Sequence, residues 1–293
     1  MDKVKIGIGT SSIGRFLPYV AEAAGLFARQ NIAAEIVNQL DEEKVVEDIV
    51  SQTIPIGTPN APSLIFSQLN GDFSGNDLVM IGGLLNRPAF YLVANQKIAA
   101  IADLKGKKVG INQPRRMAGM MMLALLRRWQ FDRDKDLELV DLGLNDRSFD
   151  ALRSGELDAA LLPPEKAFVA EADGLRIVAD TLALDSQWVP LATTRRFLAG
   201  NRELVGKVAA IYRDSVQLFK NDAPLARATI GRQLPALRSK PEVLDKCYRV
   251  FAELFESTLI VAPAALTAVL AEVALQDARA SRLIPEHLIA DLR

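Results

Sequence analysis

The chain has 293 residues, of which 49% are hydrophobic and 24% are charged, and its formal net charge is −1. This composition is typical of a globular protein long enough to form two lobes, and it lacks the long basic block that indicates a nucleic-acid partner. Because there is one cysteine, Cys247, and one histidine, His287, the sequence excludes an internal disulfide bond and a zinc site with several Cys and His ligands.

Hydropathy gives no sign of a membrane span. The longest apolar stretch, residues 259–271, contains Pro263 and is shorter than the roughly 20 residues that a spanning helix requires. Met1 leads almost directly into a predicted strand, without the apolar segment of a secretory signal peptide. We therefore expect a cytoplasmic location unless a signal peptide was removed before Met1.

Strands and helices alternate in the first third of the chain. The apolar spacing predicts strands at 4–9, 32–37, 53–57 and 78–84, and helices at 14–30, 42–50 and 61–69. On the first of these helices, Phe16, Val20, Ala23 and Phe27 form one apolar stripe. Alternation of this kind indicates a mainly parallel sheet with helices on its faces.

The same plan recurs in the middle third and then gives way to helices. Strands are predicted at 108–112, 137–142, 157–162 and 175–179, with helices at 114–129 and 149–154. From Asn201 onward the chain is nearly all helical, with a capping box at 239–242 and a helix opening at Pro263. The sequence thus predicts an α/β fold with two similar lobes, braced by C-terminal helices.

The turn after the first strand is not a nucleotide-binding loop of a familiar kind. Gly7 and Gly9 match the first two glycines of a Rossmann fingerprint, but Ser12 stands in place of the third. Asn38 replaces the acid that would bind the ribose, and the Gly-Lys-Ser/Thr of a P-loop is absent. Dinucleotide binding is therefore disfavoured.

The hydroxyls of that turn still suggest a ligand. Thr10, Ser11 and Ser12 precede a predicted helix, and a helix N-terminus offers free N–H groups and partial positive charge to an anion. The alternative is that Ser11 or Ser12 only caps the helix.

Polar turns also follow three later strands. Since ligands of open parallel sheets lie beyond the carboxyl ends of the strands, these turns are candidate binding positions. They contribute Thr58 and Asn60 after the third strand, Asn112, Gln113, Arg115 and Arg116 after the strand at 108, and Glu165 after the strand at 157. The alternatives are ordinary turn chemistry for Thr58 and Asn60, and for Glu165 a salt bridge rather than contact with a ligand amine or hydroxyl.

Three arginines favour an anionic ligand. Arg15, Arg115 and Arg116 are predicted in first turns of helices, where a cation opposes the helix dipole and so does not serve helix stability. A guanidinium can bind carboxylate, sulfonate or phosphate through two hydrogen bonds. The alternative is a solvated surface position for each.

Four stretches match a known family. They are LPYVAEAAGLF at 17–27, NRPA at 86–89, ADLKGKKVG at 102–110 and ALRSGELDA at 151–159. With these the chain, to about Leu218, resembles the periplasmic solute-binding proteins of ABC importers for nitrate, taurine and alkanesulfonates, the NMT1/THI5-like group.

The resemblance implies a type II periplasmic-binding fold. Lobe 1 would comprise residues 1–90 and 191–293, including the C-terminal helices, and lobe 2 residues 91–190, with crossovers near 87–94 and 188–193. Trp188, at the second crossover, is then expected to form an aromatic wall of the ligand site or, alternatively, to pack as a core or hinge aromatic.

The resemblance also implies the function. We expect a monomer that binds a small anionic organic solute in the cleft between the lobes by hinge closure, without a cofactor or metal. It would be the substrate-binding component of an ABC importer, with a membrane permease as partner, and periplasmic if a signal peptide was removed before Met1. The alternative is a cytoplasmic decarboxylase or lyase on the same fold that acts on a small carboxylate. Glu165 would be its candidate base, whereas the CCCFC motif of the related thiamine-pyrimidine synthases is absent.

Overall fold

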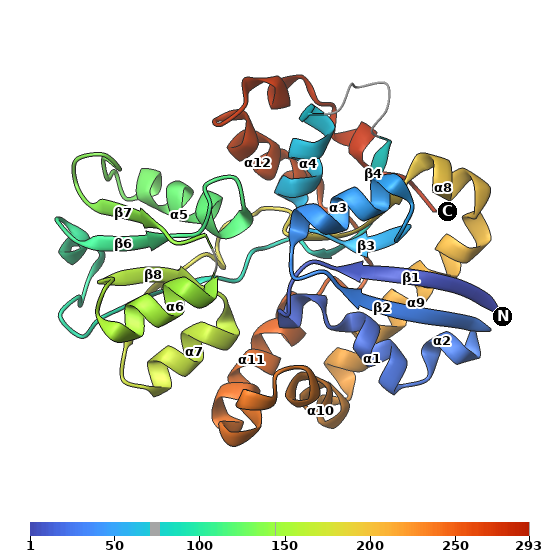
Figure 1. Cartoon of the computed structure of the whole chain (residues 1–293), viewed down its shortest axis with the longest axis horizontal. Helices are drawn as coiled ribbons and strands as arrows, with labels where there is room; N and C mark the ends of the chain where they lie inside the picture. The colour runs from blue at the N-terminus through green and yellow to red at the C-terminus, as the bar shows by residue number, and fades with distance from the viewer. Residues whose placement is uncertain (71–76, 144, 293) are drawn as a thin grey trace. The chain divides into compact units, whose positions relative to one another are not determined.

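The computed structural model describes residues 1–70, 77–143 and 145–292. The chain forms two compact units, each with its own five-stranded sheet (Figure 1). Unit 1 comprises Met1–Asn86 and Asp185–Arg293, and unit 2 comprises Arg87–Leu184. The chain therefore passes between the units twice, after Asn86 and after Leu184.

The sheet of unit 1 has the strand order β2-β1-β3-β10-β4. Its parallel half consists of β1, β2 and β3, while β10 is antiparallel to both β3 and β4. The strands span β1 Asp2–Ile8, β2 Ile32–Asn38, β3 Ile56–Thr58, β4 Leu78–Leu85 and β10 Val189–Thr194. Because β2 and β3 lie on opposite sides of β1, the strand order reverses between β1 and β3, which is where such sheets bind ligands.

The prediction of one continuous helix over residues 14–30 is wrong. Residues 13–29 form a 3-10 turn and two short helices, because Pro18 starts one helix and Gly25, in the left-handed region with φ 68°, separates it from the next. The helices of this part of unit 1 are η1 Ile13–Arg15, α1 Leu17–Ala23, α2 Leu26–Arg29, α3 Glu42–Ser51 and α4 Ala61–Asn70.

The C-terminal helices belong to unit 1. In Figure 1, α9 lies beside α1, and Phe219, Phe251 and Phe255 are fully buried within this helical layer. The predicted capping box is wrong, since Ser239 donates to the carbonyl of Ala236 and α11 begins without a side-chain cap. The elements are α8 Arg195–Gly200, α9 Arg202–Asn221, α10 Ala223–Gln233, η3 Pro235–Ser239, α11 Pro241–Leu254, α12 Pro263–Ala274, η4 Ala278–Arg282 and η5 Pro285–Leu288.

Two segments from this helical region pair with β4, the last strand of its sheet. Ile289 pairs with Met80 in parallel, and the amide of Ala290 donates to the carbonyl of Met80 at 2.9 Å. At the other end of the strand, Phe255 pairs with Leu85 in antiparallel fashion. Both ends of β4 are therefore covered on the side away from β10.

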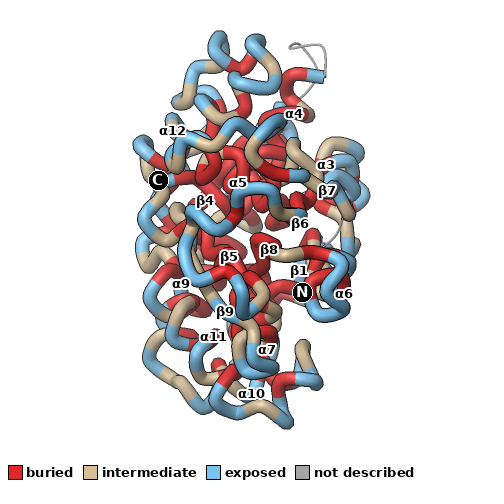
Figure 2. The backbone as a smooth tube through the Cα atoms, turned by 90° about the vertical axis from the view of Figure 1, so that its left-hand side faces the viewer, coloured by how far each residue is buried: buried red, intermediate tan, exposed pale blue. Residues whose placement is uncertain are grey.

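Unit 2 repeats the plan of unit 1, with the strand order β7-β6-β8-β5-β9. Strands β6, β7 and β8 are parallel, and β5 is antiparallel to β8 and β9. Figure 2 shows β5 and β8 as buried, and every residue of both strands is buried. The elements are β5 Tyr91–Ala94, η2 Ile101–Leu104, β6 Lys108–Ile111, α5 Met117–Arg128, β7 Glu138–Asp141, α6 Asn145–Ser154, β8 Ala159–Leu162, α7 Pro164–Ala172 and β9 Arg176–Asp180.

Asp103 and Asp158, which lie in two of the stretches that match the family, accept hydrogen bonds from backbone N–H groups of unit 2. The amides of Ala100 and Ala99 donate to the Asp103 carboxylate at 2.9 Å, and these hydrogen bonds lower the pKa of Asp103. Asp158 accepts hydrogen bonds from Lys108 and Asn95. The roles of both residues are therefore structural.

Over the described ranges, no helix combines the length and apolar character needed to cross a bilayer. The same residues bring together no cluster of three His, Cys, Asp or Glu side chains suited to a metal ion.

Gly119 allows α5 to lie directly on the turn that follows β6. A Cβ atom at this position would stand 2.3 Å from the carbonyl oxygen of Gln113 and 2.5 Å from that of Asn112. Both are backbone atoms, which cannot rotate away as a side chain can. The turn that carries Asn112 and Gln113 is thus fixed by the helix beneath it.

We expect Gly119→Ala to destabilise the protein by about 1–3 kcal/mol, because the added methyl overpacks this contact. Gly206→Ala is the matched control, since Gly206 also lies in a helix, α9, and an added Cβ would meet nothing within 4 Å. This control should stabilise the protein by about 0.5–1 kcal/mol, because alanine has a higher helix propensity than glycine. Urea unfolding measures both, and equal effects at the two positions would contradict the close contact.

Candidate functional site

The candidate residues of unit 1 gather where β1 and β3 end. Ser11 and Ser12 follow β1, while Thr58 is the last residue of β3 and Asn60 lies just beyond it. Since β1 and β3 are neighbours in register, with Ile8 opposite Thr58, these residues share one edge of the sheet. They lie at the strand-order reversal of unit 1.

A buried ion pair connects these turns. The guanidinium of Arg15, only 2% exposed, lies 2.5 Å from Oε1 of Glu42, and its Nε donates to the carbonyl of Thr58 at 3.2 Å. Oε2 of Glu42 accepts the backbone N–H of Asn60 at 2.8 Å. The positive charge of Arg15 is therefore already matched by a carboxylate.

Glu42 is the residue that the sequence interpretation missed. It is the first residue of α3 and is 3% exposed, although a glutamate there ordinarily serves the helix dipole in solvent. Gly9 leaves room for it, because a Cβ at that position would stand 2.3 Å from Oε2 of Glu42. The second glycine of the opening turn thus accommodates a carboxylate of the same unit.

Two hydroxyls at this edge are buried without a partner. Oγ of Ser12 and Oγ1 of Thr58 make no hydrogen bond to the described residues, and the two residues are 8% and 0% exposed. Ser12 makes no side-chain cap bond to the 3-10 turn that it precedes, so capping does not account for it. Buried hydroxyls are normally hydrogen-bonded, so each of these calls for a partner.

The remaining candidates of unit 1 have local partners. Oγ of Ser11 accepts from Nδ2 of Asn38 at 2.7 Å, and the carbonyl of Thr10 accepts from the amide of Ser12. Oδ1 of Asn60 accepts the N–H of Ser63 at 2.9 Å, at the start of α4. This bond uses the amide oxygen of Asn60 and leaves its NH₂ group as a donor.

In unit 2 the candidate residues lie in the turn after β6. Both ends of the Asn112 side-chain amide are hydrogen-bonded to α6. Its NH₂ group donates to Oδ1 of Asn145, and its oxygen accepts from Oγ of Ser148 at 2.5 Å. Gln113 has φ 38°, and its N–H donates to Asp141 at 3.1 Å. The sequence interpretation missed Asn145 and Ser148, because the helix was predicted to begin only at residue 149, whereas α6 begins at Asn145.

The predicted helix position of three arginines is wrong. Arg15 is the last residue of a 3-10 turn rather than in the first turn of an α-helix. Helix α5 begins at Met117, so Arg116 is its N-cap and Arg115 precedes it, because Pro114 belongs to the turn instead of opening the helix. Arg115 is exposed and Arg116 is half-buried.

Two further candidates are buried, one in each unit. Glu165, in the first turn of α7 in unit 2, is 8% exposed. Trp188 of unit 1 precedes β10 and is 3% exposed; its ring lies 6.3 Å from that of Phe251, and its carbonyl accepts the N–H of Ala61. These contacts place Trp188 in the core of unit 1.

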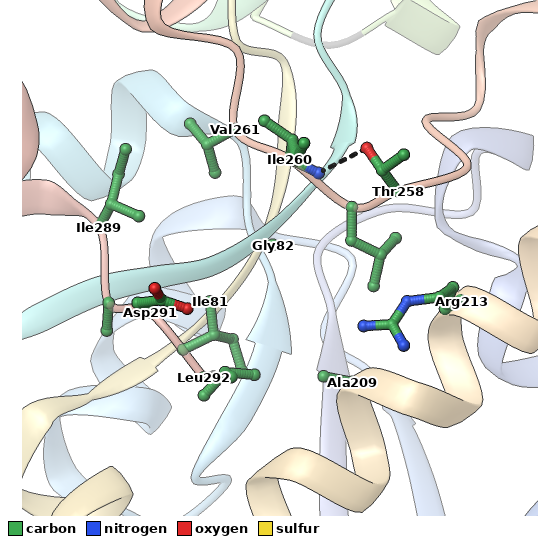
Figure 3. Close-up of a pocket in the computed structure, with 12 residues that line it drawn as sticks. Ile81, Gly82, Ala209, Arg213, Thr258, Ile260, Val261, Ile289, Asp291 and Leu292 are labelled. Carbon is green, nitrogen blue, oxygen red and sulfur yellow. Dashed lines mark hydrogen bonds between the residues drawn. The ribbon is translucent and has the colours of Figure 1, made fainter.

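A separate pocket of about 370 Å³ lies in unit 1, between β4, α9 and the C-terminal segment (Figure 3). Most of its walls are apolar, and Arg213 of α9 points into it. None of the residues predicted from the sequence to bind a ligand lines this pocket.

We expect Arg15→Met to destabilise the protein by about 3–5 kcal/mol, because it leaves the buried carboxylate of Glu42 without its cation. Arg232→Met is the control, since Arg232 is exposed on α10, and it should change stability by no more than about 0.5 kcal/mol. Denaturant unfolding monitors both variants. A loss below about 1 kcal/mol for Arg15→Met would argue against a buried pair.

Comparison with solved structures identifies the fold. The periplasmic aliphatic sulphonate binding protein SsuA from Escherichia coli matches with a TM-score of 0.80 at 17% identity, over 99% of this chain and 92% of that one. The alkanesulfonate-binding protein SsuA from Xanthomonas axonopodis pv. citri, bound to MOPS, matches with a TM-score of 0.74 at 17% identity, over 100% and 96% of the two chains. The fold is thus the type II periplasmic-binding fold expected from the sequence.

A eukaryotic protein shares this fold as well. The Candida albicans CA3427 gene product, described as having the generic periplasmic binding protein fold, matches with a TM-score of 0.69 at 11% identity, over 97% and 91% of the two chains. No functionally curated protein matches the chain by sequence. The model of the family described as NMT1/THI5 like matches residues 16–223, and the chain belongs to this family.

Proposed function

We propose that the chain is the solute-binding component of an ABC-type importer and binds a small anionic organic solute. The strand-end turns of each unit supply candidate contacts for a solute, and a solute that binds one conformation of the protein better stabilises that conformation. The same proposal includes a periplasmic location, a membrane permease as partner and a monomeric state.

The unpartnered hydroxyls of Ser12 and Thr58 carry this proposal. They lie at the strand-order reversal of unit 1, and a buried hydroxyl without a hydrogen bond costs free energy that a ligand recovers. Together with the NH₂ group of Asn60, they offer three donors to the oxygen atoms of a solute. Three neutral donors suit a sulfonate, a carboxylate or a nitrate.

Similarity to proteins of known ligand supports the same function. The Escherichia coli protein is a periplasmic aliphatic sulphonate binding protein, and the Xanthomonas protein binds MOPS, which is itself a sulfonate. In unit 2, Arg115 and Arg116 lie in the turn after β6, and we propose that they supply positive charge to the solute. Arg15 supplies less, since Glu42 matches its charge.

A thermal-shift screen of sulfonates, carboxylates, nitrate and pyrimidines tests the proposal. We expect an anionic member to raise Tm by about 5 °C or more at a hundredfold excess over its Kd. Incubation followed by mass analysis should return the ligand unchanged. Conversion of the ligand would instead favour the decarboxylase or lyase alternative, and stabilisation only by neutral or cationic compounds would refute the anionic solute.

Thr58→Val tests the role of the hydroxyls with the stabilising ligand from that screen. The substitution keeps the shape and removes an unpartnered hydroxyl, so the unliganded protein should be no less stable while affinity falls about tenfold. Thr229→Val is the matched control, because Thr229 on α10 is also buried with an unpartnered hydroxyl. Calorimetric titration compares the ligand affinities of the two variants. Equal affinities would show that the Thr58 hydroxyl does not contact the ligand.

A further inference from the structure

We propose that Glu42 is a specificity-determining residue that limits the charge of the solute group held by unit 1. It does so by cancelling the charge of Arg15, and the inference rests on the proposed function. Glu42 does not contact the solute in this proposal; it acts through the residues that it holds.

The two oxygens of Glu42 have different partners, and both partners lead to the proposed site. Oε1 pairs with the guanidinium of Arg15, whose Nε holds the carbonyl of Thr58. Oε2 holds the N–H of Asn60. The ion pair therefore fixes the backbone of Thr58 and Asn60, on either side of Pro59, whose side chains are those proposed above to bind the solute.

Structural support alone does not require a charged pair here. Replacing a buried ion pair by apolar residues is often neutral or stabilising, so such a pair is weak evidence for a role in stability. A buried arginine whose guanidinium contacts the backbone of Thr58 would by itself favour an anion at this edge, because a charge in a poorly hydrated environment acts over several ångströms. Glu42 prevents this, because its carboxylate neutralises the charge of Arg15.

The charge balance defines the class of solute group. With Arg15 matched, the unit 1 turns offer hydroxyl and amide donors and no net positive charge. They suit an uncharged oxygen, or the oxygens of a group with one negative charge such as a sulfonate or a carboxylate. A group with two charges, such as sulfate, receives too little compensation for its loss of hydration. Unit 1 thereby separates organic monoanions from inorganic dianions.

Glu42→Gln tests this proposal with inorganic sulfate as the probe. Glutamine keeps the size and one oxygen acceptor but removes the charge, so Arg15 becomes an unmatched buried cation. Ionic strength is held constant by sodium chloride. Sulfate at ten times its Kd for Glu42→Gln should raise the Tm of this variant by about 3 °C more than it raises the Tm of the wild type. The affinity for a stabilising monoanion from the screen should change less than the affinity for sulfate.

Two control variants make the test specific. Glu43→Gln removes the same charge from the exposed neighbouring residue of α3, and it should respond to sulfate like the wild type. The double variant Arg15→Gln/Glu42→Gln restores neutrality and should lose the added response. General stabilisation by sulfate would appear equally in all four proteins.

Every outcome bears on the proposal. If Glu42→Gln shows no folding transition in chloride, a transition restored by sulfate supports it, whereas failure to fold in sulfate while the double variant folds contradicts it. Equal sulfate responses in wild type and Glu42→Gln also contradict it. If no solute in the screen binds the wild type, the proposed function fails, yet the added sulfate response still shows that Glu42 screens the charge of Arg15.

Discussion

The arrangement of the candidate site in unit 1 depends on one buried ion pair, between Arg15 and Glu42. The pair joins three segments that are far apart in the sequence: the turn after β1, the start of α3 and the turn after β3. Two charges removed from water need each other, so neither turn can shift without a large electrostatic cost. The hydroxyls of Ser12 and Thr58, which make no hydrogen bond within the described part of the chain, lie on these turns and are therefore preorganised for a ligand.

In unit 2 the candidate residues also lie at the end of a strand beside the strand-order reversal, but neutral hydrogen bonds replace the ion pair of unit 1. Its turn after β6 is held by neutral hydrogen bonds from Asn112 to α6 and by the close approach of α5 at Gly119. In both units the strand order reverses between two strands that are neighbours in the sheet but not consecutive in the sequence, β1 and β3 in unit 1 and β6 and β8 in unit 2. A repeated architecture without repeated residues allows each unit to contribute its own donors.

The sequence predicted most strands and helices of the two sheets and the turns that carry candidate residues, because apolar spacing and the parallel-sheet rule are local or topological signals. It did not predict helix α7, and the regions of β5 and β10 were indicated only as crossovers by the family resemblance. It could not predict Glu42, since burial of a helix-starting glutamate depends on a glycine more than thirty residues earlier, Gly9. It misplaced Arg115 and Arg116 because a proline fits either a turn or the first turn of a helix equally well. Which candidates touch a solute is a three-dimensional property, and for those residues ligand contact stays a prediction.

The pairing along β4 has a consequence for the integrity of the fold. A terminal strand with unsatisfied backbone groups can recruit a strand from another molecule. Here Phe255 and the segment at Ile289–Ala290 occupy that side of β4. Ile289 and Ala290 therefore cover part of this edge, and removing them would expose backbone groups of β4 that can pair with a strand of another molecule.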